Sequence, residues 1–282
     1  MPATPALLAA LFFGLALITT QFGLRHMDGL AGAKVSITSA MLLWWLLFPF
    51  KGFAGWHAQA AAIFVAAGLF FPVAVTLLAY AANRRLGPTI AGAIGSAAPL
   101  FAVVGAVVFL DERLGFAQIA AILAIVIGSI VMSARHGPAQ VKLSGTWLSW
   151  LAAALRAVAQ VVAKAGLLLW PNPYAAIVLG YSVSTVVIWT VGAFSTRAES
   201  RVYHRRGVIW FVLTGLFNSG AVLALYSALE VGTVSVVSPI AASYPLVTLA
   251  LNTLVLREER LTLRLAGGVA LMVGGVMALL LV

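Results

Sequence analysis

The chain is a nearly unbroken series of apolar runs of about 20 residues, separated by short charged or Gly- and Pro-rich breaks. A helix of about 20 apolar residues crosses the roughly 30 Å hydrocarbon layer of a membrane. Hydrophobic residues make up 63% of the 282 residues and charged residues only 9%, whereas a soluble domain has about 25% charged residues. A water-soluble globule is therefore excluded, and the sequence predicts an all-α integral membrane protein.

The breaks divide the chain into ten expected spans, because an irregular backbone has no water to bind inside lipid and turns must leave it. Ten spans leave no room for a soluble domain. No Lys or Arg precedes the first apolar run, which is long enough to cross, so we expect it to be a span and not a cleaved signal peptide. The expected spans are residues 5–24, 31–49, 58–82, 88–110, 116–134, 146–169, 174–195, 208–229, 233–256 and 263–282.

The two halves of the chain resemble each other, and such self-similarity indicates a repeat architecture. The segment Tyr80–Leu114 aligns with Tyr226–Leu261. Each expected half, residues 1–138 and 139–282, contains five spans. Because five is odd, the second copy enters the membrane in the opposite direction, which gives two inverted five-helix repeats, an arrangement of many secondary transporters. The aligned residues are Tyr80 with Tyr226 and Pro99 with Pro245 at an offset of 146, Glu112 with Glu259 at 147, and Gly23 with Gly166 at 143.

A proline in the fourth span of each half, an acidic Glu-Arg-Leu turn and a glycine-rich last span give the chain a family resemblance. It resembles the ten-span EamA-type transporters of the drug/metabolite transporter superfamily over essentially its whole length. The resemblance implies a carrier in the cytoplasmic (inner) membrane that exports or takes up small metabolites such as amino acids, and export is the direction we expect. It also implies alternating access and a central cavity lined by spans of both halves.

The distribution of Lys and Arg predicts an orientation. Of the 17 Lys and Arg residues, thirteen lie in or beside the odd-numbered connections, and only Lys51 and Arg113 lie in the even ones. The positive-inside rule then places the odd connections in the cytoplasm and both termini outside. The family resemblance implies cytoplasmic termini instead, so both orientations stay open at this stage.

The sixth span carries the membrane-embedded ionisable residues, which are costly in lipid and usually functional. Arg156, Gln160 and Lys164 follow one another at i, i+4 and i+8 and share one helix face. The two cations lie about 6 Å on either side of Gln160 along the helix axis. One interpretation is that both cations reach toward lipid headgroups. The other, which we favour, is a substrate site that holds a carboxylate or phosphate.

The acidic residues narrow the substrate class. All seven carboxylates fall in loops or at span ends, so the spans offer no buried acid to pair with a lipophilic cation. We therefore expect an anionic or zwitterionic metabolite, with a multidrug exporter of cations or a lipid-handling protein as the alternatives. Glu230, at the end of the eighth span, is a candidate partner for a cation of a neighbouring helix.

Further candidates lie at repeat-related positions. Tyr80 and Tyr226 are either interfacial residues or hydroxyls at the cavity, and Asn218 either bridges helices or binds substrate. We include all three in the expected substrate site. Proline inside a span removes a backbone hydrogen bond, so the fourth and ninth spans are expected to hinge during gating. The expected hinge residues are Pro99, Pro239 and Pro245.

Acidic turns follow the fourth and ninth spans. They are either solvated loops or turns whose charges form salt bridges that close one side of the protein in one of its states. In the last span, Gly267, Gly268, Gly274 and Gly275 present a smooth face for an internal contact or a homodimer.

An enzyme is not expected. The chain has no cysteine, and His26, His57, His136 and His204 are isolated in loops, so neither a metal site nor another cofactor is expected. The basic segment 197–206 fits membrane lipid headgroups better than nucleic acid. The expected partners are thus a small metabolite and the surrounding lipids.

Overall fold

The computed structural model describes residues 2–133, 145–195, 202–254 and 262–281, and these residues form thirteen helices. Eight helical segments are long and apolar enough to cross a membrane, and Ala98–Leu110 and Phe116–Met132 are shorter apolar helices. The expected all-helical ten-span fold is confirmed. The helices are α1 (Ala3–Leu24), α2 (Gly29–Leu46), α3 (Phe48–Lys51), α4 (Ala58–Gly68), α5 (Val73–Gly95), α6 (Ala98–Leu110), α7 (Phe116–Ser133), α8 (Thr146–Leu169), α9 (Pro173–Ala193), α10 (Arg205–Val231), α11 (Val234–Ala241), α12 (Tyr244–Leu254) and α13 (Leu263–Leu281).

Helix starts follow local chemistry. Asp28 precedes α2, and its carboxylate accepts a hydrogen bond from the Leu30 amide at 3.0 Å. Asn172 caps α9 in the same way, 2.9 Å from the Ala175 amide, with Pro173 in the first turn. Such side chains satisfy amides that have no partner inside the helix. These caps set the ends of the second and seventh spans.

One expected boundary was wrong. Residues 83–87 were predicted to form the loop between the third and fourth spans, but α5 continues through them. The segment begins Asn-Arg-Arg-Leu after two alanines, and Ala, Arg and Leu are good helix formers. The helical hydrogen bonds therefore persist where the chain passes from one span to the next.

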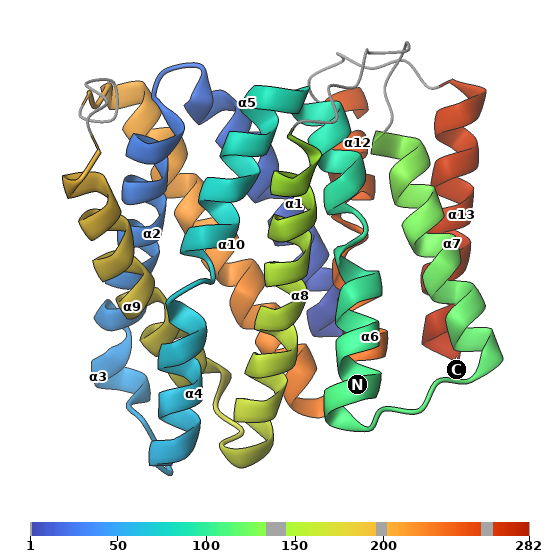
Figure 1. Ribbon diagram of the computed structural model, residues 1–282, viewed down its shortest axis with the longest axis horizontal. Helices are drawn as coiled ribbons and strands as arrows, with labels where there is room; N and C mark the ends of the chain where they lie inside the picture. Colours follow the sequence, from blue (N-terminus) through green and yellow to red (C-terminus); the bar gives the residue numbers. More distant parts are fainter. Residues whose placement is uncertain (1, 134–144, 196–201, 255–261, 282) are drawn as a thin grey trace.

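The first span of each half packs against the other half. The first span of one half, α1, packs on α10, α11 and α12 of the other half. The equivalent sixth span, α8, packs on α4, α5 and α6 of the first half. Figure 1 shows α1 and α8 in the middle of the bundle, running in opposite directions. This reciprocal packing is the arrangement expected of inverted repeats.

The remaining spans complete the bundle on either side. Helices α2 and α9 pack together at one edge, and α7 and α13 pack together at the other (Figure 1). Both termini lie at the same end of the bundle, together with the turn between α6 and α7 (Figure 1). We refer to this end as the termini end. The turn between α1 and α2 and the last turn of α9 lie at the opposite end (Figure 1).

Three spans are interrupted. The third span breaks between α4 and α5 at residues 69–72, the fourth at Ser96 and Ala97, and the ninth at Ala242 and Ser243. The last two breaks are related by the repeat offset of 146. Pro99 and Pro245 each follow as the second residue of the next helix, whereas Pro239 lies inside α11 without ending it.

Side-chain hydroxyls of neighbouring helices form hydrogen bonds at two of the breaks. The Ser184 hydroxyl on α9 lies 2.7 Å from the Gly68 carbonyl oxygen and 3.1 Å from that of Phe71. The Ser129 hydroxyl on α7 donates to Ser96 at 2.8 Å. Irregular backbone at membrane depth is tolerated where protein or water satisfies it. The breaks are thus held in place by neighbouring spans of the bundle.

Candidate functional site

The three interrupted spans meet at one cavity between the halves. Its inner part is lined at the breaks by Phe71 and Pro72, by Ser96 and Pro99, and by Ala242. Helices α1, α8 and α10 supply half of the remaining lining residues. Discontinuous helices that meet at the interface of two repeats are the usual setting of a transporter's substrate site. The other inner residues are Phe13, Val75, Thr76, Gly95, Ala98, Arg156, Ala159, Gln160, Asn218, Leu225, Tyr226, Ser238, Ala241 and Tyr244.

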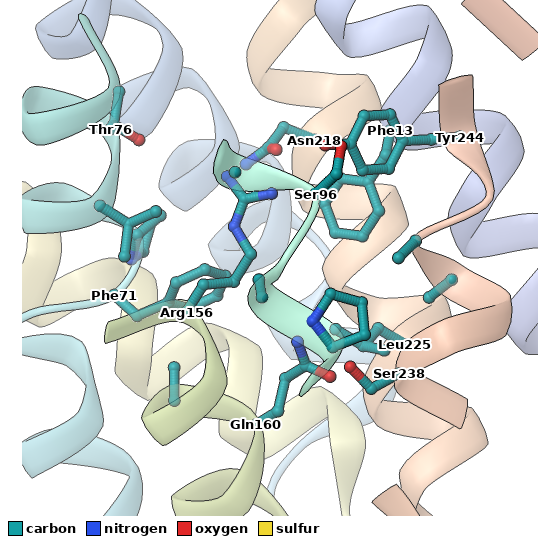
Figure 2. A pocket seen from close by; sticks show the side chains of 18 of the residues that line it. Phe13, Phe71, Thr76, Ser96, Arg156, Gln160, Asn218, Leu225, Ser238 and Tyr244 are labelled. Carbon is teal, nitrogen blue, oxygen red and sulfur yellow. The ribbon is translucent and has the colours of Figure 1, made fainter. Parts of the chain in front are cut away.

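Arg156 is the charged residue of the lining. It lies midway along α8 and borders both the inner part of the cavity and an outer part that continues from it. Figure 2 shows its side chain extending into the cavity. Within the described part of the chain, the guanidinium makes no hydrogen bond or ion pair with protein. Its five donors are therefore available to a ligand.

Gln160 and Ser238 add polar groups without partners. Gln160 lies one turn from Arg156 on α8, and its side-chain oxygen is buried with no hydrogen-bond donor among the described residues. The buried Ser238 hydroxyl on α11 also lacks a partner there. Figure 2 shows both side chains at the same end of the cavity. Because a buried unpaired polar atom costs about 1–3 kcal/mol, both atoms are suited to bind a ligand or a water molecule.

Aromatic rings cover much of the remaining surface. Phe13 and Phe71 come from the first half of the chain, and Tyr226 and Tyr244 come from the second. The rings of Phe13 and Tyr244 meet edge to face with centroids 6.3 Å apart. The cavity thus combines one cationic group and a few amides and hydroxyls with an apolar lining, as small-molecule sites commonly do.

The outer part of the cavity is rich in hydroxyls. Thr20, Tyr80 and Thr214 line it, and the Thr20 hydroxyl lies 3.5 Å from the Thr214 hydroxyl. Asn218 borders both parts and donates to the Tyr181 hydroxyl at 3.0 Å. These residues lie toward the end of α1 and the start of α10, so the cavity extends toward the end of the bundle opposite the termini.

The structure brings together five of the six expected substrate-site residues. Arg156, Gln160, Tyr226 and Asn218 line the inner part, and Tyr80 lines the outer part. Lys164 lies elsewhere: its ammonium donates to the Leu229 carbonyl oxygen at 2.7 Å, nearer the termini end.

The four glycines of α13 divide into two pairs. A Cβ atom on Gly268 or Gly275 would lie within 3 Å of atoms of α7, so these two form the internal helix contact. Gly267 and Gly274 face open space, with nothing within 4 Å of such an atom. A homodimer contact would therefore use Gly267 and Gly274, and it remains a prediction.

The acidic residues that the structure describes lie away from the cavity. Of the acidic residues that the structure describes, Asp28, Asp111, Glu112 and Glu230, none lines either part. Across the described ranges, no group of three or more His, Cys, Asp or Glu residues is placed to hold a metal ion. Near Arg156 the charge of the cavity is therefore positive.

Some lining residues were missed from sequence. Phe13, Phe71 and Ser238 lie in apolar or small-residue runs that look like ordinary span sequence. Phe13 could have been predicted from the repeat, because the offset of 143 that aligns Gly23 with Gly166 also aligns Phe13 with Arg156. Asn252, another polar residue of the ninth span, has a side chain outside the described set.

The fold and cavity define a multi-pass membrane transporter, and comparison with known proteins identifies its family. The model of the EamA-like transporter family matches residues 3–134 and again residues 143–281. The chain therefore belongs to the EamA-like transporter family, which is a family of transporters and not of enzymes. No curated protein sequence matches it.

Solved structures support the fold. One whose title reads only "Crystal structure of protein" superimposes with a TM-score of 0.79 at 18% sequence identity. The match covers 99% of this chain and 95% of that one. At this identity the likeness shows a shared fold alone.

Proposed function

We propose that this transporter carries a small anionic or zwitterionic metabolite, such as an amino acid, by alternating access. The observation that carries the proposal is the Arg156 guanidinium, which faces the cavity and has no partner among the residues that the structure describes. A guanidinium binds a carboxylate or phosphate through two parallel hydrogen bonds. Such a ligand would replace the water that an unpaired cation requires in a partly apolar site.

The same geometry disfavours a cationic cargo. An organic cation would lie near Arg156 with no lining carboxylate in the described residues to offset the repulsion. Like charges in a site of low dielectric constant repel strongly. A multidrug exporter of cations is for this reason the weaker candidate.

Export from the cytoplasm is the direction we propose. The cavity extends toward the end at which the described basic residues Arg25, Arg85 and Arg205 lie. The positive-inside rule assigns that end to the cytoplasm. A carrier in this state would load its substrate from the cytoplasm across the inner membrane, with the fourth and ninth spans as moving elements.

Reconstituted transport tests the proposal. Purified protein in liposomes is offered labelled amino acids, organic acids, sugar phosphates and organic cations, and saturable counterflow is measured. We expect flux of one anionic or zwitterionic class, reduced at least tenfold by Arg156→Gln and partly retained by Arg156→Lys. Flux of cations alone, unchanged in Arg156→Gln, would overturn the proposal, as would non-saturable lipid movement without solute flux.

A further inference from the structure

The turn between α6 and α7 reaches from the first half of the chain to the second. Asp111 ends α6 with a left-handed backbone, φ 55°, and Glu112 follows. The Glu112 carboxylate accepts hydrogen bonds from the Val234 amide at 2.7 Å and the Ser235 amide at 2.9 Å. These are the first two amides of α11, so Glu112 caps the N-terminus of the ninth span.

The cap is not a local one. Thr233, the residue before α11, makes no side-chain capping bond to the helix. A carboxylate from 122 residues earlier in the sequence takes that place, where a negative charge also interacts favourably with the helix dipole. The start of α11 is therefore held by the other half of the protein.

Lys164 belongs to the same arrangement. Its ammonium donates to the Leu229 carbonyl oxygen near the end of α10, and it interacts electrostatically with the carboxylates of Glu112 and Glu230. Through these contacts the sixth, eighth and ninth spans and the α6–α7 turn are joined at the termini end. This explains why Lys164 lies apart from Arg156 although both are on α8.

A buried apolar layer lies between these contacts and the cavity. It is formed by side chains of α6, α8, α10 and α11, the same elements that Glu112 and Lys164 join. All are at most 9% exposed, so solvent barely reaches these side chains in this state. The members of this termini-side layer are Val103, Ala106, Val161, Leu229, Val234 and Val237.

We propose that Glu112 is a gating residue, whose bonds to α11 hold the termini-side layer closed and must break before the cavity opens at that end. Helix α11 is eight residues long and is separated from α12 by the break at Ala242 and Ser243, so it can move as a unit. Lys164 adds electrostatic support to the closed state. The inference rests on the transporter fold and is independent of which anion is carried.

Thiol labelling tests the gate directly, because the chain has no cysteine and a single one can be introduced without background. Val237→Cys places a smaller side chain in the termini-side layer, one turn into α11. In phospholipid nanodiscs, where both faces meet solvent, we expect slow reaction with a water-soluble thiol reagent. Adding Glu112→Gln is expected to raise the rate at least tenfold, because each bond to α11 loses its charged acceptor.

Two further variants keep the result interpretable. Asp111→Asn removes one charge from the same turn and keeps a residue type that tolerates the left-handed backbone, so labelling of Val237→Cys should not change. Ser36→Cys reports the outer part of the cavity at the opposite end. There Glu112→Gln should slow labelling, because opening one gate of an alternating carrier closes the other.

The proposal is overturned if Glu112→Gln leaves Val237→Cys unreactive, or if Asp111→Asn raises labelling by the same factor. It is also overturned if Glu112→Gln speeds labelling at both Val237→Cys and Ser36→Cys, because that pattern indicates general loosening.

Discussion

Helices α1 and α8 occupy equivalent positions in the two halves, yet they bring different chemistry to the cavity. Each packs on the third and fourth spans of the opposite half, counted within that half. At the repeat offset of 143, Arg156 on α8 corresponds to Phe13 on α1, and Gln160 corresponds to Leu17. The symmetric features thus build the scaffold, and the asymmetric ones supply the polar groups of the site.

A similar contrast separates the third and eighth spans. The third span breaks at residues 69–72, whereas α10 continues without interruption through the equivalent residues 215–218. Asn218 in the intact helix takes the position of Pro72 in the broken one, at the offset of 146, and both line the cavity. One half offers a backbone break there, and the other offers an amide side chain.

The largest effect we predict comes from removing the charge that distinguishes α8 from α1. Arg156→Gln should lower the affinity for the transported anion by about 100-fold, because a bidentate charged contact contributes about 3 kcal/mol. Binding to purified protein measures the change. Equal affinity in the variant would mean that the anion lies elsewhere in the cavity.

The glycines of α13 that face α7 and those that face open space should respond differently to an added methyl group. Gly275→Ala places a Cβ atom 2.7 Å from the Ala121 carbonyl oxygen, so the melting temperature should fall, in line with a destabilisation of about 1–3 kcal/mol. Gly274→Ala is the matched control and should leave stability unchanged. Equal losses in both variants would contradict the assignment of Gly275 to the α7 contact.

The broken third span should depend on the Ser184 hydroxyl, which α9 supplies to it. Ser184→Ala removes the contacts with the Gly68 and Phe71 carbonyl oxygens and should destabilise the protein by about 1–2 kcal/mol. Ser182→Ala on the same helix is a suitable control, because its hydroxyl bonds only within α9 and, at an exposed position, to the Trp45 indole N–H. Thermal unfolding in detergent compares the two, and an unchanged Ser184→Ala would show that water satisfies the break.

The smallest effect is expected on α1. Phe13→Leu keeps an apolar side chain opposite Arg156, so anion affinity should change by less than about threefold, from lost ring contact alone. Titration of the purified variant with the transported compound measures the change. A loss as large as that of Arg156→Gln would mean that the two helices contribute equally to binding.

Much of the fold could be predicted from sequence, because membrane spans are set by the length and composition of apolar runs. The repeat offsets placed Pro99 and Pro245 at equivalent positions, and both follow observed breaks. The break before Val73 was not predicted. The Ser184 hydroxyl that binds the Gly68 carbonyl oxygen at this break is distant in sequence. The helical path through residues 83–87 was also missed, because Arg pairs are read as loop signals even where they can remain helical.

The candidate site was predictable only where polarity stood out against an apolar background. Arg156 and Gln160 met that condition, and so did Lys164, but helix spacing alone did not show which end of the stripe faces the cavity. That distinction required the position of the Leu229 carbonyl oxygen on α10. The role of Glu112 also depends on a contact between the two halves, which no local pattern contains.

The most direct test of the central claim pairs the transported compound with an analogue in which the carboxylate alone is replaced by an uncharged carboxamide. Affinities of both are measured for the unaltered protein and for Arg156→Gln. The account predicts that the unaltered protein prefers the anion at least tenfold and that this preference disappears in the variant. A preference that survives in Arg156→Gln, or one that never existed, would contradict the assignment of Arg156 as the anion-binding residue.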